Sequence, residues 1–151
     1  MWGKMAAAQH TEVFQCSADQ FFKIVSDYES YPQFLSEVKA CKVVKTDGST
    51  KWVDYTVNVI KTMTYRLKTT ETAPTKVAWT FDSGDIFKTM AGSWTIQPLG
   101  EKSCRCTYQV DGSFKMFVPG PIAKTLLTVN LPAMMAAYHK RIREMQKNQG
   151  S

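Results

Sequence analysis

The chain has 151 residues, 44% of them hydrophobic and 12% aromatic, which is the size and composition of one folded domain and excludes a disordered segment. Its net charge of +6 is moderate, and it has neither a signal-peptide pattern nor an uncharged run long enough to cross a bilayer. We expect one cytoplasmic domain over residues 1–151, with flexible tails at about 1–8 and 148–151. No C-x-x-C pair occurs, so we predict neither a disulfide framework nor a zinc site from the four cysteines, Cys16, Cys41, Cys104 and Cys106.

The first 35 residues predict one strand and two short helical segments. Residues 11–15 alternate like a strand, and Ser17-x-x-Gln20 is a capping-box pattern that starts a helix ending near Asp27. The apolar side of this helix contains Phe21, Phe22, Ile24 and Val25. Pro32 restricts Tyr31 to extended or turn geometry, so at most one more helical turn is expected before residue 37.

From Glu37 onward the apolar residues recur with a period of two, and turn signals follow about every dozen residues. This pattern predicts an antiparallel meander with a bulge at Asp111-Gly112. One face of each strand is expected to point inward: Val53, Tyr55, Val57 and Val59; Tyr65 and Leu67; Val77, Trp79 and Phe81; Met90, Gly92, Trp94 and Ile96; Cys104, Cys106, Tyr108, Val110, Gly112, Phe114 and Met116.

The C-terminal region, residues 118–147, predicts one long helix. Pro121 suits its first turn, and Pro132 should bend it, because an internal proline removes a backbone hydrogen bond. An apolar stripe runs along this helix and should cover the inner face of the sheet: Leu127, Leu131, Met134, Tyr138, Ile142 and Met145, with Met135 at its border. Methionine adapts to variable partners, so we interpret the helix as a bent lid. A twisted sheet wrapped around a helix leaves a gap wherever the curvature of the sheet exceeds the radius of the helix, and we infer an internal cavity.

Three segments carry a resemblance to a known family: DYESYPQFLSEV at 27–38, GDIFKTMAGSW at 84–94 and AAYHKRIREM at 136–145. They resemble the START-like superfamily, also called polyketide cyclase/dehydrase-like, and within it the coenzyme Q-binding branch. The resemblance implies the α+β helix-grip fold, in which a curved antiparallel sheet of six to seven strands wraps around a long C-terminal helix, with two short helices between strands 1 and 2. Ser36-Glu37-Val38 departs from the Pro-Trp-Cys that usually follows in the quinone-binding branch.

Residues with catalytic potential are few. No nucleophile elbow, zinc-binding helix or phosphate-binding loop is present, and we predict no catalytic residue, metal or cofactor. His139 is expected at the surface beside Lys140 and Arg141. The expected ligand-binding residues are Phe34, Tyr55, Val57, Tyr65, Leu67, Trp79, Phe81, Met90, Trp94, Tyr108, Leu131, Met134, Met135, Tyr138 and Ile142.

Three hypotheses for function follow. The first is a carrier or chaperone for an apolar small molecule such as a quinone, lipid or aromatic polyketide. The second is a cyclase or dehydrase that acts by shape and by a tyrosine or His139. The third is a ribosome- or RNA-associated module, suggested by toxin members of the superfamily and by the basic segment Lys39–Lys68. We favour the first, with peripheral contact between this segment and an anionic membrane, and we expect no nucleic-acid partner.

Overall fold

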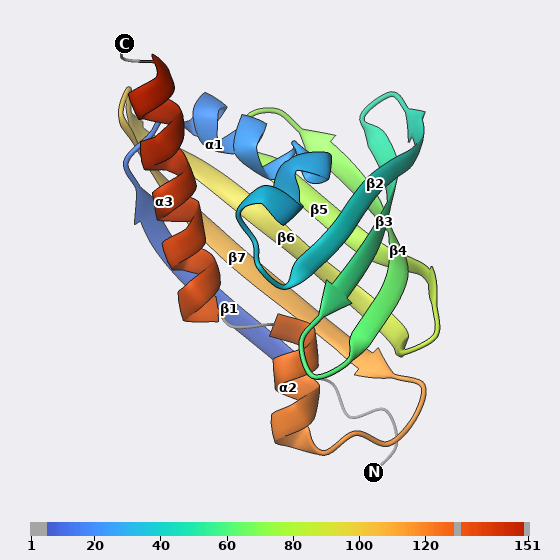
Figure 1. Cartoon of the computed structure of the whole chain (residues 1–151). Helices are drawn as coiled ribbons and strands as arrows, with labels where there is room; N and C mark the ends of the chain where they lie inside the picture. Colours follow the sequence, from blue (N-terminus) through green and yellow to red (C-terminus); the bar gives the residue numbers. More distant parts are fainter. Residues whose placement is uncertain (1–5, 129–130, 150–151) are drawn as a thin grey trace.

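A computed structural model describes residues 6–128 and 131–149 and contains a seven-stranded antiparallel sheet (Figure 1). The strand order is β1-β7-β6-β5-β4-β3-β2. Each strand from β2 to β6 therefore pairs with the next strand in sequence, and β7 also pairs with β1. The elements are β1 (Ala6–Phe14), α1 (Ala18–Val25), the 3-10 helix η1 (Tyr28–Gln33), β2 (Val38–Asp47), β3 (Thr50–Asn58), β4 (Thr62–Thr72), β5 (Lys76–Gly84), β6 (Phe87–Gly100), β7 (Ser103–Phe114), α2 (Gly120–Thr128) and α3 (Leu131–Gln149).

The predicted α+β helix-grip fold is confirmed: the sheet is curved, a long helix closes the chain, and two short helical segments lie between β1 and β2. The capping box is present, since Ser17 Oγ accepts from the Gln20 N–H and the Gln20 side chain accepts from the Ser17 N–H. β1 begins at Ala6, earlier than the predicted residue 11. The predicted tails fall mainly on residues outside the described ranges, but Ala6 to Ala8 pair with β7.

The predicted long C-terminal helix is confirmed as α3, and the preceding part of the predicted range 118–147 contains the shorter helix α2 (Figure 1). Pro121 is the second residue of α2, as predicted for a first turn. Pro132 is the second residue of α3 as described, and the bend predicted there adjoins residues 129–130. Residues 129–130, which join the two helices, lie outside the described part of the chain.

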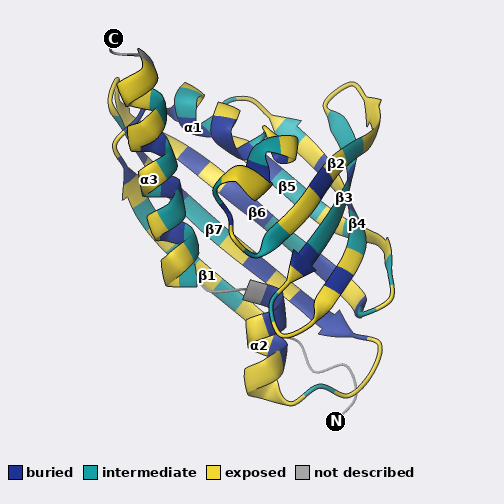
Figure 2. Cartoon of the chain, in the orientation of Figure 1, coloured by how far each residue is buried: buried dark blue, intermediate teal, exposed yellow. Residues whose placement is uncertain are grey.

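The inward faces of the strands agree with the predicted alternation except at two places (Figure 2). Met116 lies beyond the end of β7 and is 45% exposed, because the strand stops at Phe114. The predicted bulge at Asp111-Gly112 is absent, and both residues pair in register with Ala91 and Met90. Gly112 has a packing reason instead: a Cβ there would lie 2.9 Å from Leu127 Cδ1 of α2.

The helical elements pack at both edges of the sheet and over its middle strands. α2 packs against β1 and β7, α3 runs along β1, α1 lies over β5 to β7, and η1 packs on β2 (Figure 1). α2 and α3 therefore lie at the β1 edge of the sheet, and η1 lies at the β2 edge.

Candidate functional site: an internal cavity

A cavity of about 120 Å³ lies between the sheet and the helical elements. Its wall combines side chains from β2 to β7 with residues of η1, α2 and α3. Among the described residues that form this wall there is no carboxylate, imidazole, amine or guanidinium. Its polar groups are the hydroxyls of Tyr28, Tyr31, Tyr55, Tyr65, Thr69, Tyr108 and Tyr138 and the indole N–H groups of Trp79 and Trp94.

Ten of the fifteen expected ligand-binding residues line this cavity: Tyr55, Val57, Tyr65, Leu67, Trp79, Met90, Trp94, Tyr108, Met134 and Tyr138. They come from five strands and one helix, and the period-two and helical patterns place them on one side.

The other five are not part of the wall. Met135 and Ile142 are buried, but they pack in the core beside the cavity. Phe34 contacts the edge of the Tyr138 ring and lies under Arg141. Phe81 packs near Phe87, and Leu131 is half-buried at the start of α3.

Eight wall residues were not among those expected: Tyr28, Tyr31, Leu35, Val38, Thr69, Val77, Val110 and Leu127. Val77, Val110 and Leu127 lie on faces that the pattern marks as inward. Thr69 shares the inward phase of Tyr65 and Leu67 but is polar. Tyr28 and Tyr31 are three residues apart and so lie on the same face of η1, but a 3-10 helix of six residues is too short to give a recognisable periodic pattern in the sequence.

The tyrosines of the wall are buried or half-buried, and several interact with one another. The rings of Tyr55 and Tyr65 stack at 5.5 Å, and the Tyr31 hydroxyl donates to the carbonyl oxygen of Val25. Burial raises the pKa of Tyr31, Tyr55, Tyr65, Tyr108 and Tyr138 above the ordinary value of 10. These hydroxyls therefore stay neutral at physiological pH and can only serve as hydrogen-bond groups.

A polar cluster lies at one end of the cavity, where η1 meets the ends of β3 and β4. The Tyr28 hydroxyl donates to Glu71 Oε2 at 2.6 Å, and Lys51 Nζ lies 3.0 Å from the same oxygen. Burial and the bond to Glu71 raise the pKa of Tyr28. At the other end the wall consists of Val57, Met90, Val110 and Leu127, so it is apolar.

His139 was expected as a surface residue, but it is paired with Glu12. It is not part of the cavity wall either. Its Nε2 lies 2.6 Å from Glu12 Oε2 on β1, and its ring packs 4.6 Å from the Phe14 ring. His10 Nε2 lies 2.7 Å from the other oxygen, Glu12 Oε1. Because a carboxylate can only accept, both imidazoles donate, and these bonds hold the pKa of Glu12 below 4.5.

The four cysteines are buried and form no disulfide. Cys104 Sγ and Cys106 Sγ lie 3.6 Å apart, side by side on β7. Contact with Cys104, together with burial, raises the pKa of the Cys16 and Cys106 thiols, so they remain protonated. Within residues 6–128 and 131–149 no group of three or more His, Cys, Asp or Glu side chains is arranged to hold a metal ion.

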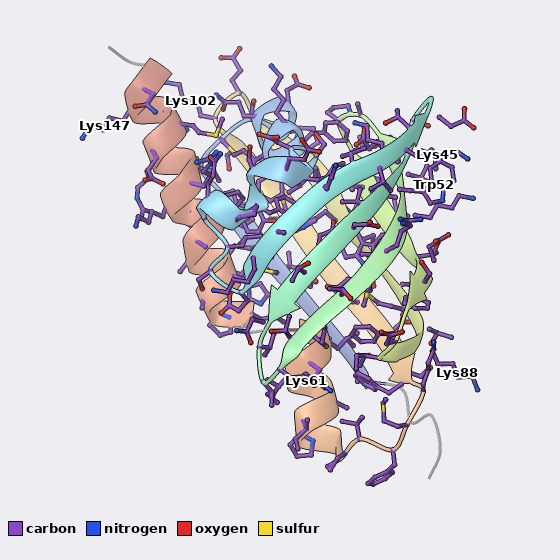
Figure 3. The ribbon with its side chains drawn as sticks, turned by 45° about the vertical axis from the view of Figure 1, so that its right-hand side comes forward. Lys45, Trp52, Lys61, Lys88, Lys102 and Lys147 are labelled. Atoms are coloured by element: carbon purple, nitrogen blue, oxygen red, sulfur yellow. The ribbon has the colours of Figure 1, made fainter. Side chains whose placement is uncertain are left out.

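The basic segment Lys39–Lys68 is partly neutralised by ion pairs. Lys51 points inward to Glu71, and Arg66 makes a two-bond ion pair with Asp54 at 2.6 and 3.1 Å. On the outer face Lys45 lies close to Trp52, with its Nζ 4.5 Å from the ring centroid (Figure 3). Lys68 Nζ lies 5.7 Å from the centroid of the same ring. No helix in the described ranges has the length and hydrophobicity needed to span a bilayer.

The fold and its largely apolar cavity define a START-like helix-grip protein. A family model described as "Polyketide cyclase / dehydrase and lipid transport" matches residues 15–138, and the chain belongs to this family. The sequence is 30% identical over 113 residues to the ribosome association toxin RatA of Escherichia coli. The aligned region covers 73% of this chain and 70% of the toxin.

Solved structures agree with this assignment. A START superfamily protein from Mycobacterium smegmatis superimposes with a TM-score of 0.82 at 25% identity, covering 92% of this chain and 98% of its own. The Zhui aromatase/cyclase from Streptomyces sp. R1128 superimposes with a TM-score of 0.78 at 13% identity, covering 98% and 97%. The second likeness concerns the fold alone. The predicted superfamily is thus confirmed, whereas its coenzyme Q-binding branch stays a prediction.

Proposed function

We propose that this protein binds a small apolar, ring-containing molecule in the cavity between the sheet and the helices, as a carrier or chaperone. The observation that supports the proposal is the cavity itself, with its aromatic and aliphatic wall. A cavity of about 150 Å³ in another protein binds benzene, so 120 Å³ corresponds to roughly one ring. A quinone, lipid or polyketide would require α2, α3 or η1 to move outward.

The composition of the wall favours binding over acid–base catalysis. A general acid or base must reach its substrate and have a pKa near the working pH. The titratable side chains of the described wall are tyrosines whose pKa values are raised by burial, and His139 faces Glu12 on β1. A cyclase role, the second hypothesis, would have to rely on the shape of the wall.

Titration with small aromatic molecules tests the binding proposal. Met90 and Met134 belong to the wall, so the methionine methyl resonances of the protein should shift on addition of toluene. Val110→Phe places extra volume inside the cavity and should lower the affinity for toluene, measured from these shifts, at least tenfold. Val13→Phe is the matched control, because Val13 is 39% exposed on β1. Binding that is equal in both variants, or absent from the wild-type protein, would contradict the proposal.

Ribosome association is a second candidate, supported by the likeness to RatA and by the cluster of Lys45, Trp52 and Lys68 on the outer face. Exposed lysines around an aromatic ring suit contact with a phosphate backbone, and such contact weakens steeply with salt. We expect co-sedimentation with ribosomes at low salt that is lost in a Lys45→Glu/Lys68→Glu variant.

The control for this experiment is Lys102→Glu/Lys147→Glu, which changes the net charge equally. These two lysines lie near the C-terminal end of α3, away from Lys45 and Trp52 (Figure 3). Equal loss in both double variants would indicate a nonspecific charge effect, and no sedimentation of the wild-type protein would exclude this candidate.

A further inference from the structure

Thr69 is an unusual residue in the cavity wall. It lies on the inner face of β4, is 1% exposed, and borders the cavity next to Leu67. Within residues 6–128 and 131–149, its Oγ1 is the one buried side-chain nitrogen or oxygen atom that has no hydrogen-bond partner. A buried hydroxyl without a partner destabilises a protein, and valine has nearly the same shape without this penalty. The hydroxyl therefore calls for a partner from outside the chain.

The neighbours of Thr69 do not supply that partner. Lys51 and Trp79 are its cross-strand partners on β3 and β5. Lys51 Nζ instead binds Glu71, and Glu71 also accepts from Tyr28. This cluster is satisfied internally, so Thr69 is left at the boundary between it and the cavity.

The position of Thr69 also makes the two ends of the cavity different in polarity. Thr69 is the last residue of β4 in the wall and lies at the end of the cavity beside the Tyr28–Glu71–Lys51 cluster. The opposite end is formed by aliphatic and thioether side chains, among them Met90, Val110 and Leu127. A guest with one polar atom and a hydrocarbon body would match this distribution in a single orientation.

We propose that Thr69 is the orienting contact of the cavity, and that its hydroxyl hydrogen-bonds an oxygen at one end of a ring-containing guest. The guest class is an aromatic molecule with a hydroxyl or carbonyl group, held with that oxygen toward η1 and its hydrocarbon end toward α2. A hydroxyl both donates and accepts, so Thr69 serves either group. This inference rests on the proposed binding function and adds the chemical class of the ligand.

Phenol and toluene provide the test, because they have the same number of non-hydrogen atoms and differ in one hydroxyl. Each is titrated into the wild-type protein, Thr69→Val and Thr70→Val, with the methionine methyl resonances as the signal. Thr70 is the exposed neighbour on the outer face of the same strand, so it is the matched control. In Thr69→Val we expect phenol affinity to fall five- to tenfold and toluene affinity to stay equal or rise. In Thr70→Val both affinities should stay unchanged.

Stability measurements separate this role from a purely structural one. Thr69→Val should melt at the same or a higher temperature than the wild-type protein, because it removes an unsatisfied buried hydroxyl. Thr69→Ser keeps the hydroxyl and should keep the wild-type ratio of phenol to toluene affinity. An unchanged ratio in Thr69→Val overturns the role of Thr69 while leaving the binding function intact. Failure of both probes to bind the wild-type protein overturns the binding function and this inference with it.

Discussion

Two neighbouring regions of the interior are built from similar residues, yet one is filled and the other is hollow. In the filled region, at the start of the chain, the rings of Phe14 and Phe21 stack at 4.6 Å and both side chains have zero exposure. In the hollow region the rings of Tyr55, Tyr65 and Tyr108 line a cavity and keep partial exposure. Trp94 and Tyr138 contact each other at 5.3 Å and form the boundary.

The difference follows from which elements lie over each part of the sheet. β1, β6 and β7 are covered by α1 and α3, so Phe21 can reach the Trp94 ring at 5.0 Å. The inner faces of β3 and β4 have no long helix directly above them, and rigid tyrosine rings cannot bend to fill the distance. The aromatic side chains of the sheet therefore form a packed core where a long helix covers them and line a cavity where none does.

The largest expected effect concerns the filled region. Phe21→Ala should lower the free energy of unfolding by about 3–5 kcal/mol, because it removes a fully buried ring from a close-packed site. Urea denaturation followed by circular dichroism measures this change. Phe117→Ala, at a position that is 62% exposed, is the control and should change stability by less than about 0.5 kcal/mol. A small loss in Phe21→Ala would show that this region is not filled as described.

The sequence predicted which residues of the strands face inward better than it predicted which of them border the cavity. Period two placed Tyr55 and Tyr65 on the inner face, since each strand has one buried side. It could not show which inward residues border space, so Met135 and Ile142 were expected at the cavity although they pack in the core. Distances between sheet and helix depend on contacts far apart in the sequence, and a pattern along one element contains no such distance.

Proline and threonine show the same limit at single positions. Pro132 is compatible with either a bend or a first turn, and only tertiary packing decides between them. Thr69 has the inward phase, but a polar residue there reads as a weaker core position rather than as a contact for a guest. Tyr28 and Tyr31 were outside any periodic pattern, so their place in the wall required the structure.

A medium effect is expected at the glycine beneath the Trp79 ring. A Cβ on Gly92 would lie 2.5 Å from Trp79 Cζ2, so Gly92→Ala must push this ring away from β6 and toward the cavity. We expect a loss of about 1–3 kcal/mol in stability and weaker binding of toluene, since the variant overpacks the wall. Gly100→Ala, where a Cβ meets nothing within 4 Å, should leave both properties unchanged. Unaltered toluene binding in Gly92→Ala would separate the Trp79 ring from the guest site.

The smallest effect belongs to the polar contacts that fasten α3 to β1 beside the filled region. Hydrogen bonds from His139 and His10 lower the pKa of Glu12, so the folded state favours the ionised carboxylate. The resulting stability is full above the ordinary pKa of 4.5 and is lost as the pH falls through the lower folded-state value. Because the Glu12 side chain is 27% exposed, Glu12→Gln should cost about 1 kcal/mol or less at pH 7. In urea denaturation the difference in stability between variant and wild type should shrink as the pH falls below 4.5, and toluene affinity should be equal in the two proteins at pH 7. A variant that weakened toluene binding would instead show that this fastening controls the hollow region as well as the filled one.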